Sequence, residues 1–400
     1  MDDTPPQAAT PQHGPPFAGY QSEIFLRGMA GETPELPVSI DELARHVAGE
    51  AEPKAAAYVF GGAGREDTMR ENEAAFRRVR IVPRMLRDVS ERDLSVEIAG
   101  TRMPAPLGLA PIGVQMIVHP EGELAVARAA AAVGLPLTVS TVSSFTLEEI
   151  AAAAQGPKWF QLYWPRDPEL VTSLVRRAEL AGYEAIVVTL DTFLPGWKTR
   201  DLQTAWQPFL EGVGVANYFS DPVFLAGLDA PPDEDPQAAV GQFVWQFSNP
   251  GLEWADLEHL RATTELPILL KGILHPDDAR KAVEAGVDGV VVSNHGGRQV
   301  DGAIASLDAL PPIRDAVGDG LTVLLDSGIR SGADVFKALA LGADAALVGR
   351  PYLWGLAAGG EAGALAVLRS LLAELDLTVG LSGLRSPAEI GPGAVSRDPD

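Results

Sequence analysis

The sequence contains no cysteine, and it has few basic residues and no long apolar run. Without cysteine there can be no disulfide, thiolate nucleophile or zinc–thiolate site. The chain has 31 Lys and Arg against 54 Asp and Glu, which gives a formal net charge of −23. Such a charge repels nucleic acid and anionic membranes, and no apolar run reaches the length of a membrane span. We therefore expect a soluble, cytoplasmic protein that binds small molecules, and neither nucleic acid nor membrane.

The N-terminal segment has neither the basic region nor the apolar region of a secretory signal. Its Pro, Gln and Ala content predicts a disordered arm over residues 1–20. Residues 21–400 contain enough apolar residues for one large core, and we expect them to form a single domain.

Eight short apolar runs alternate with helical stretches from about residue 100 to about residue 350. The runs are apolar throughout, as parallel strands buried on both faces are. Most are separated by about one strand–helix unit in length. The fold class predicted is therefore α/β, a (β/α)8 TIM barrel. The runs are residues 106–110, 136–140, 158–163, 185–190, 267–272, 288–294, 322–327 and 344–349.

The connection after the fourth run, residues 191–266, is far longer than one helix requires. Long insertions after a barrel strand lie at the C-terminal face, where active sites are built. We therefore predict that residues 200–255 form a lid. Residues 21–100 are expected to be mainly helical, with a short strand pair near 93–100 as a plug. Two more helices are expected beyond residue 350.

Glycine and arginine follow the last two apolar runs, in DSGIRSGAD and VGRPY. The loops after strands seven and eight are the usual phosphate site of this fold. Gly328 and Gly349 would let backbone N–H groups approach an anion, and Arg330 and Arg350 would pair with it. The competing interpretation is ordinary turn glycines with solvent-facing arginines.

The segment SNHGGRQVDG, after the sixth run, is the most specific motif. It combines His295, which can accept a proton near neutral pH, with Arg298, which can bind a carboxylate in a forked geometry. Asp191 ends the fourth run and could orient the imidazole. The other five histidines have no metal-ligand spacing, so we predict no metal site.

Several segments resemble the FMN-dependent α-hydroxy-acid oxidase and dehydrogenase family over about residues 20–390. They are SNHGGRQVDG, LLDSGIRSGADVFKALALGAD, LKGILHPDDARKAVEAGVDG and HPEGELAVARAA. Other segments, among them VPRMLRDVSERDLSVE and TLDTFLPGWKTRDL, resemble the lactate 2-monooxygenase branch of that family.

The resemblance implies FMN as cofactor and a small L-2-hydroxy acid, L-lactate first, as substrate. With O2 as acceptor, lactate would become acetate, CO2 and water. The resemblance also implies a homo-oligomer, a tetramer. His295 would be the catalytic base with Asp191 as its partner, and Tyr163 would lie near the substrate hydroxyl. Tyr58 and Arg298 would hold the substrate carboxylate.

The same resemblance implies a set of cofactor-binding residues, with Lys271 beside the flavin and two arginines at the phosphate. Two positions depart from the family pattern. Lys198 stands where an arginine often helps to bind substrate, and Val142 stands where some members have tryptophan. The cofactor-binding set is Pro111, Ile112, Gly113, Ser140, Gln161, Thr189, Lys271, Ser293, Asp326, Gly328, Arg330, Gly349 and Arg350.

Three alternatives remain open from the sequence. The first is an oxidase of lactate, glycolate, mandelate or a similar acid, which releases the 2-keto acid and hydrogen peroxide. The second is a phosphate-binding barrel isomerase without redox chemistry, although His295, Arg298 and Lys271 together disfavour it. The third is a flavin or ligand binder without catalysis, which an intact base disfavours.

Overall fold

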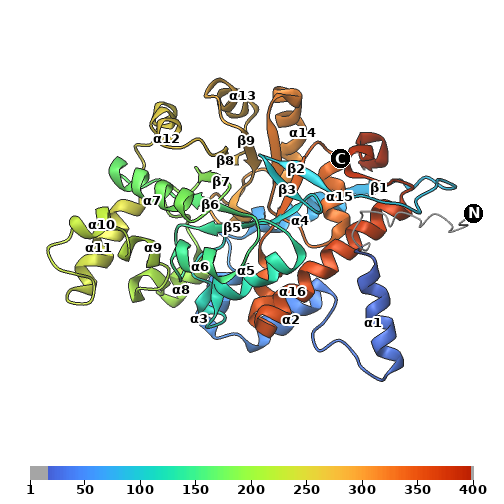
Figure 1. The fold of residues 1–400 in the computed structure, drawn as a ribbon, viewed down its shortest axis with the longest axis horizontal. Helices are drawn as coiled ribbons and strands as arrows, with labels where there is room; N and C mark the ends of the chain where they lie inside the picture. Colours follow the sequence, from blue (N-terminus) through green and yellow to red (C-terminus); the bar gives the residue numbers. More distant parts are fainter. Residues whose placement is uncertain (1–16, 398–400) are drawn as a thin grey trace, which may run out of the picture.

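The computed structural model describes residues 17–397, and a closed barrel of eight parallel strands lies at its centre (Figure 1). Neighbours in the chain are neighbours in the barrel, and β11 pairs with β4 to close it. Each apolar run forms one strand, which confirms the predicted TIM barrel. The strands are β4 (Leu107–Leu109), β5 (Leu137–Ser140), β6 (Lys158–Leu162), β7 (Ala185–Thr189), β8 (Ile268–Ile273), β9 (Gly289–Val292), β10 (Thr322–Leu325) and β11 (Ala345–Val348).

Helices cover the outside of the barrel because each presents an apolar face to the strands. In α13, for example, the buried residues are Ala279 and Ala282, while the charged residues around them face outward. Thr146, Asp167 and Ser331 cap the first turns of α6, α7 and α15 with their side chains. The outer helices are α5 (Gly122–Val133), α6 (Leu147–Ala153), α7 (Pro168–Leu180), α12 (Leu257–Thr263), α13 (Pro276–Glu284), α14 (Ser306–Val317), α15 (Gly332–Ala340) and α16 (Arg350–Leu381).

A hairpin closes the N-terminal end of the barrel. Its strands are β2 (Val96–Ile98) and β3 (Thr101–Met103). Ile98 and Met103 pack against interior side chains of the barrel, and Thr101 accepts a hydrogen bond of 2.9 Å from the indole of Trp159. This pair is the plug expected from the sequence. The open end is therefore the C-terminal one.

The N-terminal segment is helical, as expected, but its first helix begins at Gly19, inside the predicted arm. The boundary at residue 20 is therefore wrong, and residues 1–16 of that arm lie outside the described residues. At the other end, α16 is kinked at Gly359 and Gly360, which makes it two helices. The remaining elements here are α1 (Gly19–Met29), α2 (Ile40–Glu50), α3 (Pro53–Phe60), α4 (Asp67–Arg77) and the antiparallel pair β1 (Val79–Ile81) and β12 (Val395–Arg397).

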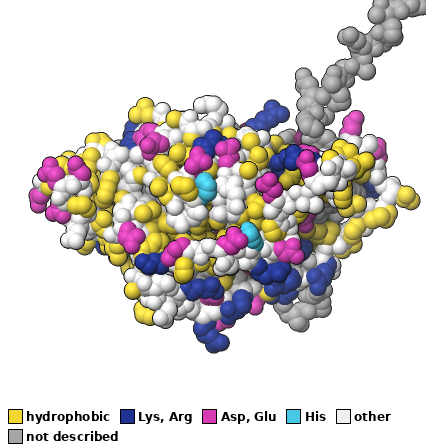
Figure 2. All heavy atoms as spheres, turned by 90° about the horizontal axis from the view of Figure 1, so that it is seen from below, with side chains coloured by type: hydrophobic (Ala, Val, Ile, Leu, Met, Phe, Trp, Pro, Cys, Tyr) yellow, Lys and Arg dark blue, Asp and Glu magenta, His cyan; other side chains and the backbone are white. Residues whose placement is uncertain are grey.

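The insertion between β7 and β8 is also helical, and α9, α10 and α11 form one end of the molecule in Figure 1. Acidic side chains gather at that end in Figure 2, where the connection from α10 to α11 exposes Asp229, Asp233, Glu234 and Asp235. Within residues 17–397, no helix is long and apolar enough to cross a membrane. The insertion comprises α8 (Thr199–Thr204), α9 (Ala216–Phe219), α10 (Pro222–Ala226) and α11 (Pro236–Phe247).

Candidate active site

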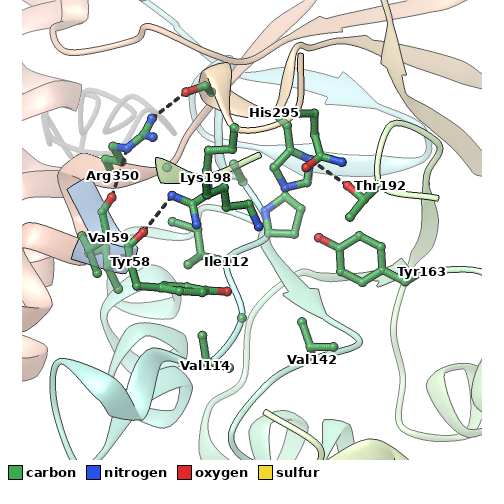
Figure 3. A pocket seen from close by; sticks show the side chains of 18 of the residues that line it. Tyr58, Val59, Ile112, Val114, Val142, Tyr163, Thr192, Lys198, His295 and Arg350 are labelled. Carbon is green, nitrogen blue, oxygen red and sulfur yellow. Dashed lines mark hydrogen bonds between the residues drawn. The ribbon is translucent and has the colours of Figure 1, made fainter. Parts of the chain in front are cut away.

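A cavity lies at the C-terminal mouth of the barrel, lined by the ends of strands, by α3 and by the insertion. Tyr58, Tyr163, Lys198 and His295 come from four different segments and turn toward one space (Figure 3). The predicted residues that line it are Tyr58, Pro111, Ile112, Gly113, Tyr163, Lys198, Lys271, His295, Arg298, Asp326, Gly328, Arg330, Gly349 and Arg350.

His295 and Asp191 form the pair expected from the sequence, although they are 104 residues apart. Nδ1 of His295 lies 2.8 Å from Oδ1 of Asp191, and both side chains are largely buried. The hydroxyl of Thr192 donates to the same carboxylate oxygen at 3.0 Å. An ionised carboxylate can only accept a hydrogen bond, so Nδ1 of His295 must carry the hydrogen. Nε2 is therefore left as the basic atom.

Burial keeps the imidazole of His295 neutral. Burial lowers the pKa of His295 below its usual value, although Asp191 opposes the shift, so the imidazole can accept a proton at neutral pH. Burial alone would raise the pKa of Asp191, but His295 and Lys271 outweigh it and hold the group ionised. An ionised Asp191 then stabilises the imidazolium that proton transfer produces.

The loop that carries His295 is held in an uncommon conformation. His295 has φ of 59°, in the left-handed region that costs a non-glycine residue about 1–2 kcal/mol. Asn294 fixes the turn, because its side chain exchanges two hydrogen bonds with Asn72 of α4, at 2.8 and 2.7 Å. Gly297 passes so close to Met69 that an added Cβ would lie 2.6 Å from its backbone nitrogen. The rest of the fold thus holds the base in place.

Lys271, at the end of β8, is a buried cation beside this pair. Its Nζ lies 2.9 Å from the hydroxyl of Ser293 and 3.1 Å from a carboxylate oxygen of Asp326. Burial would lower the pKa of Lys271, but Asp326 and Asp191 raise it, so the ammonium stays charged. Ser293, predicted to bind the cofactor, is buried behind the cavity wall and contacts Lys271 instead.

Arg298 lines the same cavity and lies over the ring of Tyr58. Its guanidinium carbon is 5.0 Å from the centre of that ring. Nη1 donates to the backbone oxygens of Tyr58 and Gly61, both at 2.7 Å, which leaves the N–H groups of Nε and Nη2 for other acceptors. The anchored guanidinium therefore has a free edge that matches a carboxylate.

The two tyrosines of the cavity can donate hydrogen bonds. Burial raises the pKa of Tyr58, and Asp201 adds to the shift. Burial also raises the pKa of Tyr163, where Asp191 acts in the same direction. Both hydroxyls therefore keep their protons at neutral pH and can donate hydrogen bonds to substrate oxygens.

The phosphate end predicted from the sequence brings Arg330 and Arg350 into the same cavity wall. Arg350 donates to three backbone oxygens, of Val59, Gly296 and Gly61, at 3.0 to 3.2 Å, and forms no ion pair within residues 17–397. Burial lowers the pKa of Arg350 to about 9, and the cations of Arg298 and Arg330 add to the shift. A buried cation without a counter-ion calls for an anionic ligand, which an FMN phosphate would supply.

Three residues of the predicted flavin contact set lie below this cavity, at the strand ends. Ser140, Gln161 and Thr189 are buried, and Ser140 donates to Oε1 of Gln161 at 3.0 Å. Nε2 of Gln161 and the hydroxyl of Thr189 are buried, and neither has a hydrogen-bond partner in the described part of the chain. Such unpaired groups are costly unless a ligand satisfies them. The polar edge of an isoalloxazine ring, with its nitrogen and carbonyl acceptors, suits them.

Gly113 explains how a flat ring would fit above these groups. An added Cβ there would lie 2.5 Å from the backbone oxygen of Val142, so the β4 loop and the β5 loop touch. This contact keeps Pro111 and Ile112 along one side of the cavity. The residues present therefore fit FMN.

Sequence reasoning missed several residues of the site. Thr192 directly follows Asp191 and could have been found from that position. Asn72 could not, because nothing in α4 marks it as the partner of a loop 222 residues away. The apolar side chains of the insertion that line the cavity, Phe209, Leu210, Phe243, Val244 and Phe247, were also missed as individual contacts.

The cavity combines a histidine–aspartate pair, an arginine that can bind a carboxylate and two arginines suited to a phosphate. These features define a barrel enzyme that acts on small anions. The family model for FMN-dependent dehydrogenases matches residues 48–397. The chain therefore belongs to the FMN-dependent α-hydroxy-acid oxidase and dehydrogenase family, and FMN is its cofactor.

Relatives of known activity agree with this assignment. An FMN-dependent alpha-hydroxy acid dehydrogenase of Penicillium citrinum is 45% identical over 378 residues, which is 93% of this chain and 94% of the relative. An L-lactate oxidase of Lysinibacillus sphaericus is 44% identical over 365 residues, 91% and 94% of the two chains. A crystal structure of mandelate oxidase superimposes with a TM-score of 0.81 at 42% identity, covering 90% of this chain and 98% of the other.

The first prediction concerns the phosphate end. Arg350→Gln is expected to weaken FMN binding about 10- to 150-fold, because a hydrogen bond to a charged group contributes about 1.5–3 kcal/mol. Fluorescence of FMN released on dilution measures the dissociation constant. Arg280→Gln, which removes an exposed arginine paired with Asp277 on α13, is the matched control and should leave FMN binding unchanged. Wild-type affinity in the Arg350 variant would show that the phosphate lies elsewhere.

Proposed function

We propose that this protein oxidises a short L-2-hydroxy acid, with L-lactate as the preferred substrate, and that O2 is the final electron acceptor. The observation that carries the proposal is the neutral His295, fixed by Asp191 at 2.8 Å, in a cavity that also presents the free edge of Arg298. The family assignment disfavours a phosphate-binding barrel isomerase without redox chemistry.

The residues divide the work on the substrate. Nε and Nη2 of Arg298 hold the carboxylate, and the hydroxyl of Tyr58 donates to it. The hydroxyl of Tyr163 donates to the substrate oxygen, and Nε2 of His295 accepts a proton from the substrate. FMN, when bound, accepts the two electrons that the substrate loses. Lys271 holds positive charge near the ring and so favours its reduction.

The insertion supports a proposal about the fate of the product. Its side chains line the cavity at 207–210 and 243–248, and the aromatic rings of Phe209, Phe243 and Phe247 contact one another with centroids 5.5 to 6.0 Å apart. We infer that this lid retains the keto acid in the cavity while O2 reoxidises the reduced cofactor. Lactate and O2 then give acetate, CO2 and water, the outcome of a lactate 2-monooxygenase.

The second prediction is therefore that acetate is the main product of aerobic turnover with L-lactate. Loosening the lid by Phe209→Ala and Phe247→Ala should shift the products toward pyruvate and hydrogen peroxide, because product release becomes faster. Acetate, pyruvate and peroxide are measured together without catalase. Phe193→Ala, an exposed residue of the same insertion, is the control. Stoichiometric peroxide from the wild-type protein would make it an oxidase.

A second candidate substrate class is favoured by the apolar wall. Val114 and Val142 line the cavity together with Tyr163 (Figure 3), and we infer that these small side chains leave room for a substrate side chain larger than methyl. Relatives named mandelate oxidase and 4-hydroxymandelate oxidase act on aromatic hydroxy acids. Flavin reduction rates with glycolate, L-lactate and (S)-mandelate decide between a small and an aromatic side chain.

A further inference from the structure

Asp201 has a property that the proposed reaction does not explain. It lies on α8, one helical turn after Lys198, and its residue is only 5% exposed. Both carboxylate oxygens are buried and have no hydrogen-bond partner among the residues that the structure describes. No ion pair of 4.0 Å or less reaches it within residues 17–397. Burying an unpaired carboxylate is costly, so its presence needs a reason.

The charges around Asp201 supply one. Lys198 directly precedes this helix, and Arg298 comes from the loop after β9; both line the cavity. Burial raises the pKa of Asp201, and these two cations oppose that shift. From α3, which packs against α8, Tyr58 is the titratable group that faces it. The remaining cation of α8, Arg200, is matched by Glu66 at 2.6 Å. Among these groups, Asp201 is thus the carboxylate that faces both Lys198 and Arg298.

Lys198 and Arg298 oppose each other electrostatically. Burial and the neighbouring cation of Arg298 together lower the pKa of Lys198 to about 8, against the opposing effect of Asp201. Two adjacent cations suit an anionic ligand, but they repel one another until it arrives.

We propose that Asp201 is a positioning residue for the substrate carboxylate: it is the buried counter-charge that holds Lys198 as an ammonium beside Arg298. It contacts no substrate and acts through Lys198. This role rests on the proposed binding of a 2-hydroxy acid at Arg298, and it gives Lys198 a function where the family pattern has arginine. A lysine can lose its proton near neutral pH and so requires this neighbour, whereas a guanidinium does not.

The test is the alkaline limb of kcat/KM for L-lactate, which reports groups of the free enzyme. In the wild-type protein it should fall as pH rises through about 8, because Lys198 loses its charge. In Asp201→Asn the limb should move down by about one pH unit, so that kcat/KM at pH 8 drops about fivefold. At pH 6.5 it should change less than twofold, with kcat unaffected. Asp233→Asn, at the exposed tip of the insertion, is the matched control.

Rescue separates positioning from a structural role. In Lys198→Arg and in the double variant Asp201→Asn/Lys198→Arg the alkaline limb should vanish, because guanidinium does not titrate there. Asp201→Asn should unfold at the same temperature as the wild type or higher, since it removes an unpaired buried charge. A limb that stays in place in Asp201→Asn, or that persists in Lys198→Arg, overturns the proposal.

Oxalate binding, measured by calorimetry across the same pH range, distinguishes this inference from the proposed function. Oxalate presents carboxylates but has no C–H bond to oxidise. If wild-type protein binds oxalate with a limb near pH 8 that Asp201→Asn shifts, the role of Asp201 is supported even where no hydroxy acid reduces the flavin. In that case the proposed function alone fails.

Discussion

His295→Asn is expected to slow flavin reduction by L-lactate about 10²- to 10⁴-fold, the range that general-base catalysis contributes, while FMN stays bound. Asparagine is the suitable replacement because it tolerates the left-handed φ of 59° better than alanine does. Its amide can donate and accept hydrogen bonds but cannot take a proton. Stopped-flow absorbance of the flavin under anaerobic conditions measures the rate directly.

The pH dependence gives the same prediction a second readout. The base must be neutral to act, and the pKa of His295 lies below its usual value. The reduction rate should therefore be constant around pH 7 and fall as acidification passes that lowered pKa and protonates the imidazole. In His295→Asn this acid limb should disappear along with most of the rate.

Two further variants frame the result. His259→Asn changes an exposed histidine on α12 whose ring nitrogen lies within hydrogen-bond distance of Thr172 and Pro168, and it should leave the rate unchanged. Asp191→Asn should also slow reduction strongly, because an amide at that position can favour the wrong imidazole tautomer. If His295→Asn reduces its flavin at nearly the wild-type rate, another group is the base.

The barrel and the core of the site could be predicted because each depends on a local signal. Short continuous apolar runs such as residues 185–189, alternating with helical stretches, indicate parallel strands buried on both faces, and polar residues at the ends of such strands share one mouth. Asp191 and His295 follow two different strands of that mouth, so their pairing follows from topology. The (β/α)8 fold and this pair therefore needed no knowledge of long-range contacts.

Other features depend on contacts that no local pattern encodes. The sequence predicts that Arg350 binds phosphate, but not that three of its five N–H groups hold the backbone of Val59, Gly61 and Gly296, which leaves two N–H groups and the charge for an anion. The segment TRDLQTAW likewise gives no sign that the carboxylate of Asp201 is buried without a hydrogen-bond partner among the described residues, because its pattern is that of an ordinary amphipathic helical turn. The boundary near Gly19 was misjudged because Pro-rich composition ends gradually, while a helix begins at one residue.

Arg298→Met is expected to raise KM for L-lactate about 30- to 5,000-fold, since removing one partner of a desolvated, hydrogen-bonded charge pair costs about 2–5 kcal/mol. The substitution should raise KM more than it lowers kcat, because the guanidinium binds the carboxylate equally before and during proton transfer. Arg350 also donates to Gly61 O at 3.0 Å, so part of the support for the backbone that Arg298 holds remains in place. The dissociation constant of oxalate, from its perturbation of the flavin spectrum, measures binding without turnover.

Arg298→Lys is the informative companion because it keeps the charge and removes the fork. Lysine cannot donate to Tyr58 O and Gly61 O and also present two parallel N–H groups to a carboxylate. Its KM should fall between those of the wild type and Arg298→Met, and its flavin should still be reduced completely at saturating lactate. If lysine restores wild-type affinity, charge alone suffices and the forked contact is unnecessary. If both variants bind oxalate normally but are no longer reduced, Arg298 serves the chemical step and the carboxylate is held by Lys198 and Tyr58 instead.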